Sequence, residues 1–204
     1  MRTVKDRKHR HRSWFRRVLR ERSGAAALEF AILAPMFFLI VFATVETFVA
    51  YTAEQMLINA NDTMARRVRM GEITFNMGRP TDMNEAQFRA AFCAELTVLL
   101  SCSSTEATRP SRLFLDVRSA NSFSTLPANS VPRIGDSKTG PLDTSAFRFS
   151  PGGKSSINIV RAYYSWPIIL DYIRPVLANL PSADGSLKDY LMVATNVIQS
   201  EEFK

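Results

Sequence analysis

The sequence predicts an α+β protein in which a long N-terminal transmembrane helix continues as an amphipathic helix and a small outer domain with an antiparallel sheet follows. Three observations support this prediction: an uncharged apolar run at 30–45, apolar residues at helical spacing in 53–70, and short strand-like segments after residue 111. The 204 residues suit one membrane segment and one modest domain. We expect a basic cytoplasmic leader at 1–24, the helix at 25–71 and the outer domain at 72–204.

The membrane span is predicted from length and charge. No charged residue occurs from Phe30 to Val45, and only Glu46 interrupts the apolar run up to Tyr51. Twenty-two helical residues cover roughly 33 Å, which is about the thickness of one hydrocarbon core. Two alternatives are a buried core helix and a removable secretory signal cut near Ala43. Glu46 is expected at the membrane surface or in contact with a partner helix inside the membrane.

The orientation of the span follows from its flanking charges. Residues 1–22 contain ten Lys or Arg and two acids, whereas the first basic residue after the span is Arg66. The positive-inside rule places the N-terminus in the cytoplasm and the domain outside, which is the periplasm in a bacterium. Basic residues beside a span attract anionic lipid, and the body has a net charge of −1. We therefore expect no nucleic-acid partner.

The amphipathic continuation places apolar side chains on one helix face. Leu57, Ala60, Met64 and Val68 recur at steps of three and four residues. Gly71, just after a basic last turn, is the expected stop of the helix.

The outer domain is expected to mix one helix with short strands. An apolar stripe predicts a helix over 84–100, and a short helix is expected within 167–180, interrupted at Pro175. Four segments rich in β-branched and aromatic residues predict strands: 112–119, 146–149, 156–166 and 190–200.

Composition excludes several kinds of catalytic site. His9 and His11 both lie in the leader, so the body can build neither a histidine-dependent triad nor a histidine-ligated metal site. Its acids show no spacing typical of a catalytic pair, and we expect no enzyme, cofactor or metal. The only cysteines, Cys93 and Cys102, form a disulfide if the domain lies in an oxidising compartment. Alternatively, Cys93 is buried in the helix stripe and Cys102 is free.

The segment from Gly24 to Phe30 carries the functional prediction. Glu29 places a carboxylate in what should be lipid, at a cost of about 2.5–3.5 kcal/mol, and such residues usually have a function. If the bond after Gly24 is cut, Ala25 gains a free amine, and Glu29 lies one helical turn away at i+4. Glu29 could then pair with its own amine or with that of a neighbouring chain. The alternative is a flexible connection, with Glu29 in the headgroup layer.

This segment resembles a class III, type IV prepilin-like cleavage site, and residues 20–71 resemble the TadE-like family of the tight-adherence (Flp) pilus system. The resemblance rests on the basic leader, Gly24, Ala25, Glu29, Phe30, Ala31, Pro35, the apolar run, the segments 53–60 and 65–67, Gly71 and Glu72. The C-terminal segment 195–203 resembles the closing strand of the family, although Ser200, Glu201 and Glu202 depart from its usual ending.

The resemblance implies a minor pseudopilin or a pilus-assembly factor that serves adhesion from the bacterial inner membrane. Gly24 and Ala25 would flank the bond cut by a prepilin peptidase, and Glu29 with Phe30 would serve recognition and assembly. The implied partners are that peptidase, other pseudopilins, pilus-assembly proteins and the membrane. Some relatives are not processed. The alternative function is that of an unprocessed, signal-anchored periplasmic binding or sensor module.

Overall fold

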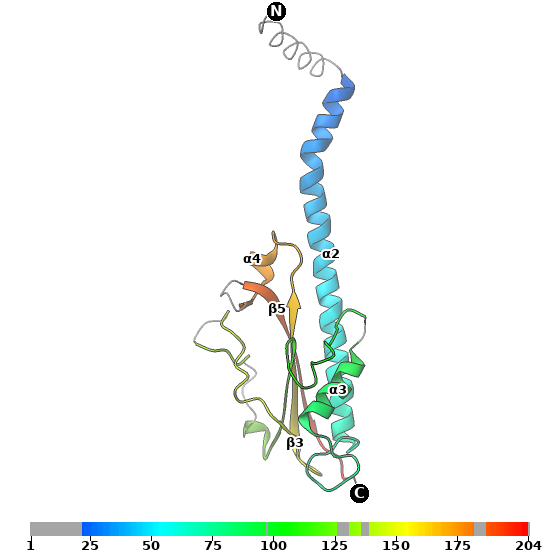
Figure 1. Cartoon of the computed structure of the whole chain (residues 1–204), viewed down its shortest axis with the longest axis vertical. Coiled ribbons are helices and arrows are strands. Elements are labelled where there is room, and N and C mark those ends of the chain that lie inside the picture. Colours follow the sequence, from blue (N-terminus) through cyan, green and yellow to red (C-terminus); the bar gives the residue numbers. More distant parts are fainter. Residues whose placement is uncertain (1–21, 97, 126–130, 136–138, 182–186, 204) are drawn as a thin grey trace, which may run out of the picture. The chain divides into compact units, whose positions relative to one another are not determined.

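A computed structural model of the chain describes residues 22–96, 98–125, 131–135, 139–181 and 187–203 (Figure 1). The predicted leader lies largely outside the described residues. Helix α2 runs from Arg22 to Arg69. The chain divides into two compact units, Met1–Val45 and Glu46–Lys204, and α2 contributes to both. The second unit combines the C-terminal part of α2 with a mixed sheet, so the predicted α+β plan is confirmed.

The sheet has five strands in the order β2-β1-β3-β5-β4. The strands are β1 (Leu113–Ala120), β2 (Phe149–Ser150), β3 (Ile157–Pro167), β4 (Leu180–Pro181) and β5 (Leu187–Gln199). Neighbouring strands are antiparallel except β1 and β2, which pair in parallel through Val117 with Phe149 and Arg118 with Ser150. The sheet is thus antiparallel as predicted except at this edge, where β2 runs in the same direction as β1. A parallel neighbour needs a long connection, and 28 residues separate these two strands.

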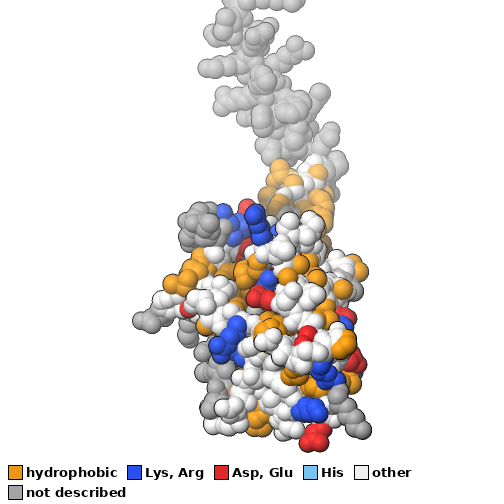
Figure 2. Space-filling view, turned by 60° about the horizontal axis from the view of Figure 1, so that its bottom comes forward, with side chains coloured by type: hydrophobic (Ala, Val, Ile, Leu, Met, Phe, Trp, Pro, Cys, Tyr) orange, Lys and Arg blue, Asp and Glu red, His pale blue; other side chains and the backbone are white. Residues whose placement is uncertain are grey.

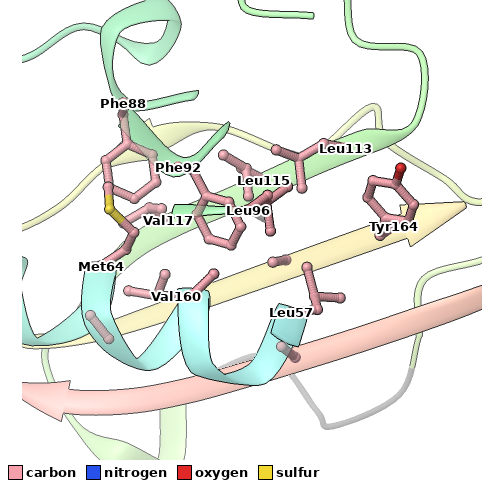
Figure 3. Packing of buried hydrophobic residues seen from close by; sticks show 14 of the residues in the cluster. Leu57, Met64, Phe88, Phe92, Leu96, Leu113, Leu115, Val117, Val160 and Tyr164 are labelled. Atoms are coloured by element: carbon pink, nitrogen blue, oxygen red, sulfur yellow. The ribbon is translucent and has the colours of Figure 1, made fainter. Parts of the chain in front are cut away.

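The core lies between one face of the sheet and the helices. The predicted stripe of Leu57, Ala60, Met64 and Val68 is buried, which confirms the amphipathic continuation. Figure 3 shows Leu57 and Met64 of α2 facing Phe88, Phe92 and sheet residues. Burial of each large side chain contributes about 1.5–3 kcal/mol, so this stripe holds the second half of α2 on the sheet.

Helix α3 (Glu85–Glu95) is shorter than the predicted 84–100. Asn84 begins it with a capping box shared with Gln87. The structure pairs Cys93 and Cys102 in a disulfide with a Cα–Cα separation of 5.8 Å. A continuous helix would separate them by about 13.5 Å, since each residue rises 1.5 Å. The helix must therefore end early for these two cysteines to meet.

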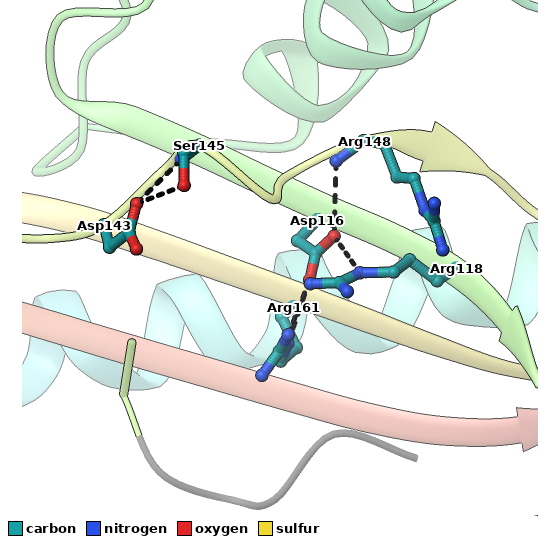
Figure 4. A network of polar contacts seen from close by, with 6 residues as sticks. All are labelled: Asp116, Arg118, Asp143, Ser145, Arg148 and Arg161. Atoms are coloured by element: carbon teal, nitrogen blue, oxygen red, sulfur yellow. Dashed lines mark hydrogen bonds and ion pairs between the residues drawn. The ribbon is translucent and has the colours of Figure 1, made fainter. Parts of the chain in front are cut away.

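The other face of the sheet buries an ion cluster. Asp116 is fully buried and accepts hydrogen bonds from both Arg118, at 2.7 Å, and Arg161, at 2.6 Å and 3.2 Å (Figure 4). Burial alone would raise the pKa of Asp116, but the arginines outweigh it and lower that pKa. Because β1 and β3 supply all three residues, this cluster supports the sheet.

A second buried carboxylate organises the loop before β1. Glu106 accepts hydrogen bonds from the backbone N–H groups of Ser111, Arg112 and Leu113 and from the Ser111 hydroxyl. Burial would raise the pKa of Glu106, but these hydrogen bonds lower it to about 2. No sequence pattern points to this residue, since its partners are mostly backbone groups.

The end of α2 meets the C-terminus of the chain. Gly71 has φ +75°, and a Cβ placed on it would overlap the Phe203 ring. The Glu201 N–H donates to the Arg69 carbonyl at 2.9 Å, and the side chains of these residues form an ion pair at 3.3 Å. The C-terminal residues Glu201 and Phe203 thus contact the end of α2.

Candidate functional site

The candidate site is the N-terminal part of α2, whose apolar side chains are exposed on every side. All seven residues from Met36 to Phe42 are exposed, and seven residues make about two turns of helix. A surface helix of a water-soluble domain would instead show one apolar stripe. Thr44 donates its hydroxyl to the Ile40 carbonyl at 2.8 Å, so this polar group is satisfied within the helix.

Within the described part of the chain, α2 alone is long and apolar enough to cross a membrane. The burial pattern agrees, because an apolar helix with no internal partner needs lipid or other helices around it. These properties indicate a single-pass, membrane-anchored protein.

The predicted processing residues lie at the start of the same helix. Gly24 and Ala25 fall within the first turn of α2, which begins at Arg22. Glu29 lies in the second turn, Phe30 begins the third, and both side chains are exposed. Among the side chains that the structure describes, none forms an ion pair with Glu29.

Glu46 contacts a segment of its own chain that the sequence did not predict as its partner. Its side chain is only 9% exposed, although it follows directly on the exposed apolar run. Its carboxylate accepts the backbone N–H of Ile169 at 2.6 Å and that of Leu170 at 3.0 Å. The partner is thus a loop of the same chain, and no sequence signal points to it, because backbone N–H groups occur at almost every residue.

The loop held by Glu46 begins a segment with exposed apolar side chains. It leads from β3 into the short helix α4 (Arg174–Leu177). We expected Pro175 to interrupt this helix, but it lies in the first turn, where proline is tolerated. A cavity of about 210 Å³ lies beside Glu46, and its lining includes Ala50, Trp166 and Leu177. The two Glu46 hydrogen bonds therefore join this segment to α2 beside the cavity.

No group of three or more His, Cys, Asp or Glu side chains comes together, in the part of the chain that the structure describes, in a way that could hold a metal ion. The face of the second unit drawn in Figure 2 carries acidic, basic and apolar side chains interspersed, which is typical of a solvated surface.

Comparison with known proteins finds a family match, and it falls on helix α2. Residues 24–66 match the family model described as TadE-like protein, and this range runs from the predicted processing site into the buried part of α2. It covers 43 of the 204 residues. No curated protein and no solved structure matches the chain. The resemblance seen in the sequence is therefore confirmed over residues 24–66, and this TadE-like segment suggests an association with a Tad pilus.

Proposed function

We propose that this protein is a minor pseudopilin or pilus-assembly factor of a Tad (Flp) pilus, cut after Gly24 by a prepilin peptidase. It acts by assembly with other pilus proteins and not by catalysis. The observation that carries the proposal is the location of the TadE-like match, which begins at Gly24 and includes the only acid of the 24–45 segment, Glu29.

Glu29 supplies the mechanism of assembly. After cleavage the Ala25 amine lies four residues before Glu29, which is about 6 Å along a helix axis. Both charges are costly in lipid, and each offsets the cost of the other when they pair. Pairing between neighbouring chains would set the axial position of one helix against the next. The exposure of Glu29 and the apolar surface around it support this role.

The proposed topology places the N-terminus in the cytoplasm and the domain at 72–204 in the periplasm of a bacterium. The excess of Lys and Arg before the span supports this orientation. The Cys93–Cys102 disulfide also supports it, because disulfides persist in the periplasm and are rare in the cytosol.

Mass spectrometry of the mature N-terminus tests cleavage. Membranes from cells with and without the prepilin peptidase are compared. We expect Ala25 as the first residue only when the peptidase is present. Retention of Met1 in both strains would overturn processing and favour the alternative, a permanently anchored binding or sensor module.

Substitution tests the role of Glu29 separately. Glu29→Gln should abolish co-isolation of the processed protein with the pilus fraction while leaving its amount in the membrane unchanged. Glu202→Gln is the matched control, since it removes the same charge from an exposed residue at the other end of the chain. If both variants co-isolate with the pilus fraction to the same extent, Glu29 has no role in assembly.

A further inference from the structure

We propose that residues 168–177 form a second membrane contact, in which the outer unit rests on the lipid surface beside the point where α2 leaves it. This inference requires that α2 spans the membrane, but it does not require cleavage after Gly24.

The first observation is a cluster of exposed apolar side chains. Ile169 is 79% exposed, Tyr172 is 75% exposed and Val176 is 83% exposed. Eight of the ten residues in 168–177 are apolar or aromatic, and the two charged ones, Asp171 and Arg174, pair with each other at 2.5 Å. A surface segment of this kind is unfavourable in water but suits the headgroup–acyl boundary, where a buried depth of about 5–10 Å is typical.

The second observation fixes the level of this cluster along α2. Ile169 donates its N–H to Glu46, and Glu46 directly follows the last residue of the uncharged run, Val45. Phe48 and Tyr51, the next large apolar side chains of α2, are also exposed. From Glu46 to Tyr51 the helix rises about 7.5 Å, which is within the thickness of an interfacial layer.

The third observation indicates that lipid, and not another protein, covers this patch. Tyr172 and Tyr51 provide two exposed aromatic rings with hydroxyl ends, which is typical of the interfacial belt of membrane proteins. Glu46, which directly follows the uncharged run in the sequence, holds this patch through two hydrogen bonds. Lipid is therefore the partner that a membrane-spanning run brings to it. A neighbouring pilus protein on the same patch is the competing occupant that the test must separate.

The test measures lipid contact at one residue in the full chain. Tyr172→Cys is labelled with an NBD fluorophore and reconstituted into phosphatidylcholine–phosphatidylglycerol vesicles that contain a lipid with a nitroxide high on its acyl chain. The native cysteines are joined in the disulfide, so the introduced thiol is the one that reacts, and the parent protein gives the labelling background.

Phe123→Cys is the matched control. Phe123 is an exposed aromatic residue, at 63%, and it lies beyond the opposite end of β3 from Ile169. The eleven residues of β3 separate the two ends by roughly 33 Å, which is far beyond the reach of a shallow nitroxide.

We expect blue-shifted emission and strong nitroxide quenching at position 172, several-fold greater than at position 123. Equal quenching at the two positions would overturn the proposal. A blue shift at 172 that appears only when other pilus proteins are added, and without quenching by the lipid nitroxide, would also overturn it. Adding Glu46→Gln to the Tyr172→Cys protein should lower the quenching, whereas Glu54→Gln should not.

Discussion

The Glu46 carboxylate receives the backbone N–H of Ile169 at 2.6 Å, across 123 positions of the sequence. This hydrogen bond joins the residue at the end of the apolar run to the loop that leaves the central strand of the sheet. An acid at the edge of a membrane span is costly when it has no partner. Here two backbone donors stabilise it, and the same contacts hold the segment 168–177 in place.

Glu46→Gln should destabilise the outer unit by about 2 kcal/mol, because hydrogen bonds to a charged group contribute about 1.5–3 kcal/mol and the amide can accept from only one oxygen. Urea unfolding of the detergent-solubilised full chain, followed by circular dichroism, measures the change. Glu54→Gln, two turns further along α2, should stay within about 0.5 kcal/mol of the parent protein. Equal losses in the two variants would show that the Glu46 contacts contribute little.

Acid should weaken the protein through Glu106. Its folded pKa is about 2, against an unfolded value near 4.5, so the unfolded state binds a proton first as the pH falls. The stabilisation by Glu106 is complete above about pH 4.5 and is lost as the pH decreases toward 2. Urea midpoints measured from pH 7 to pH 2.5 should decline in this window.

Glu106→Gln isolates that contribution. The variant should be less stable than the parent at pH 7 by about 2 kcal/mol, because buried N–H groups lose a charged acceptor. Its stability should also fall less steeply below pH 4.5, because the variant lacks the Glu106 carboxylate. Some decline remains, since Asp116 and the other acids titrate in both proteins. Parallel pH profiles for parent and variant would contradict the role of Glu106.

Gly71→Ala should destabilise the end of α2. A residue with a side chain costs about 1–2 kcal/mol in the left-handed conformation, and the new Cβ would also overlap the Phe203 ring. Gly78 provides a matched control, since it has φ +69° but no atom lies within 4 Å of the position that its Cβ would take. Gly78→Ala should therefore show only the conformational cost in thermal unfolding. If Gly71→Ala loses no more stability than Gly78→Ala, the Phe203 contact is unimportant.

Loss of the disulfide should lower stability moderately. The Cys93–Cys102 bond closes a short loop, for which the chain-entropy model gives about 2–3 kcal/mol. Cys93→Ser with Cys102→Ser should shift the urea midpoint by the corresponding amount. Thiol labelling of membranes before and after reduction then reports the compartment: labelling only after reduction supports a periplasmic domain, and labelling before reduction contradicts it.

The local pattern of the sequence was sufficient to predict the long helix α2 and most strands of the sheet. The run without charge predicted the span, and the spacing of Leu57 to Val68 predicted which face of α2 is buried. These features depend on the neighbours of each residue along the chain, so periodicity reveals them. The Gly24–Phe30 segment could be recognised for the same reason, since the residues of the proposed mechanism lie within about two turns of helix.

Tertiary structure alone decided the contacts that join distant segments. The parallel edge pair, the early end of α3, the partner of Glu46 and the docking of Phe203 at Gly71 each depend on where the chain returns in space. Most of these contacts use backbone groups or a close approach, which carry no residue-specific signal. The sequence by itself therefore determined the membrane anchor and the TadE-like segment, and only the fold showed that the first acid after the span holds a loop with exposed apolar side chains beside it.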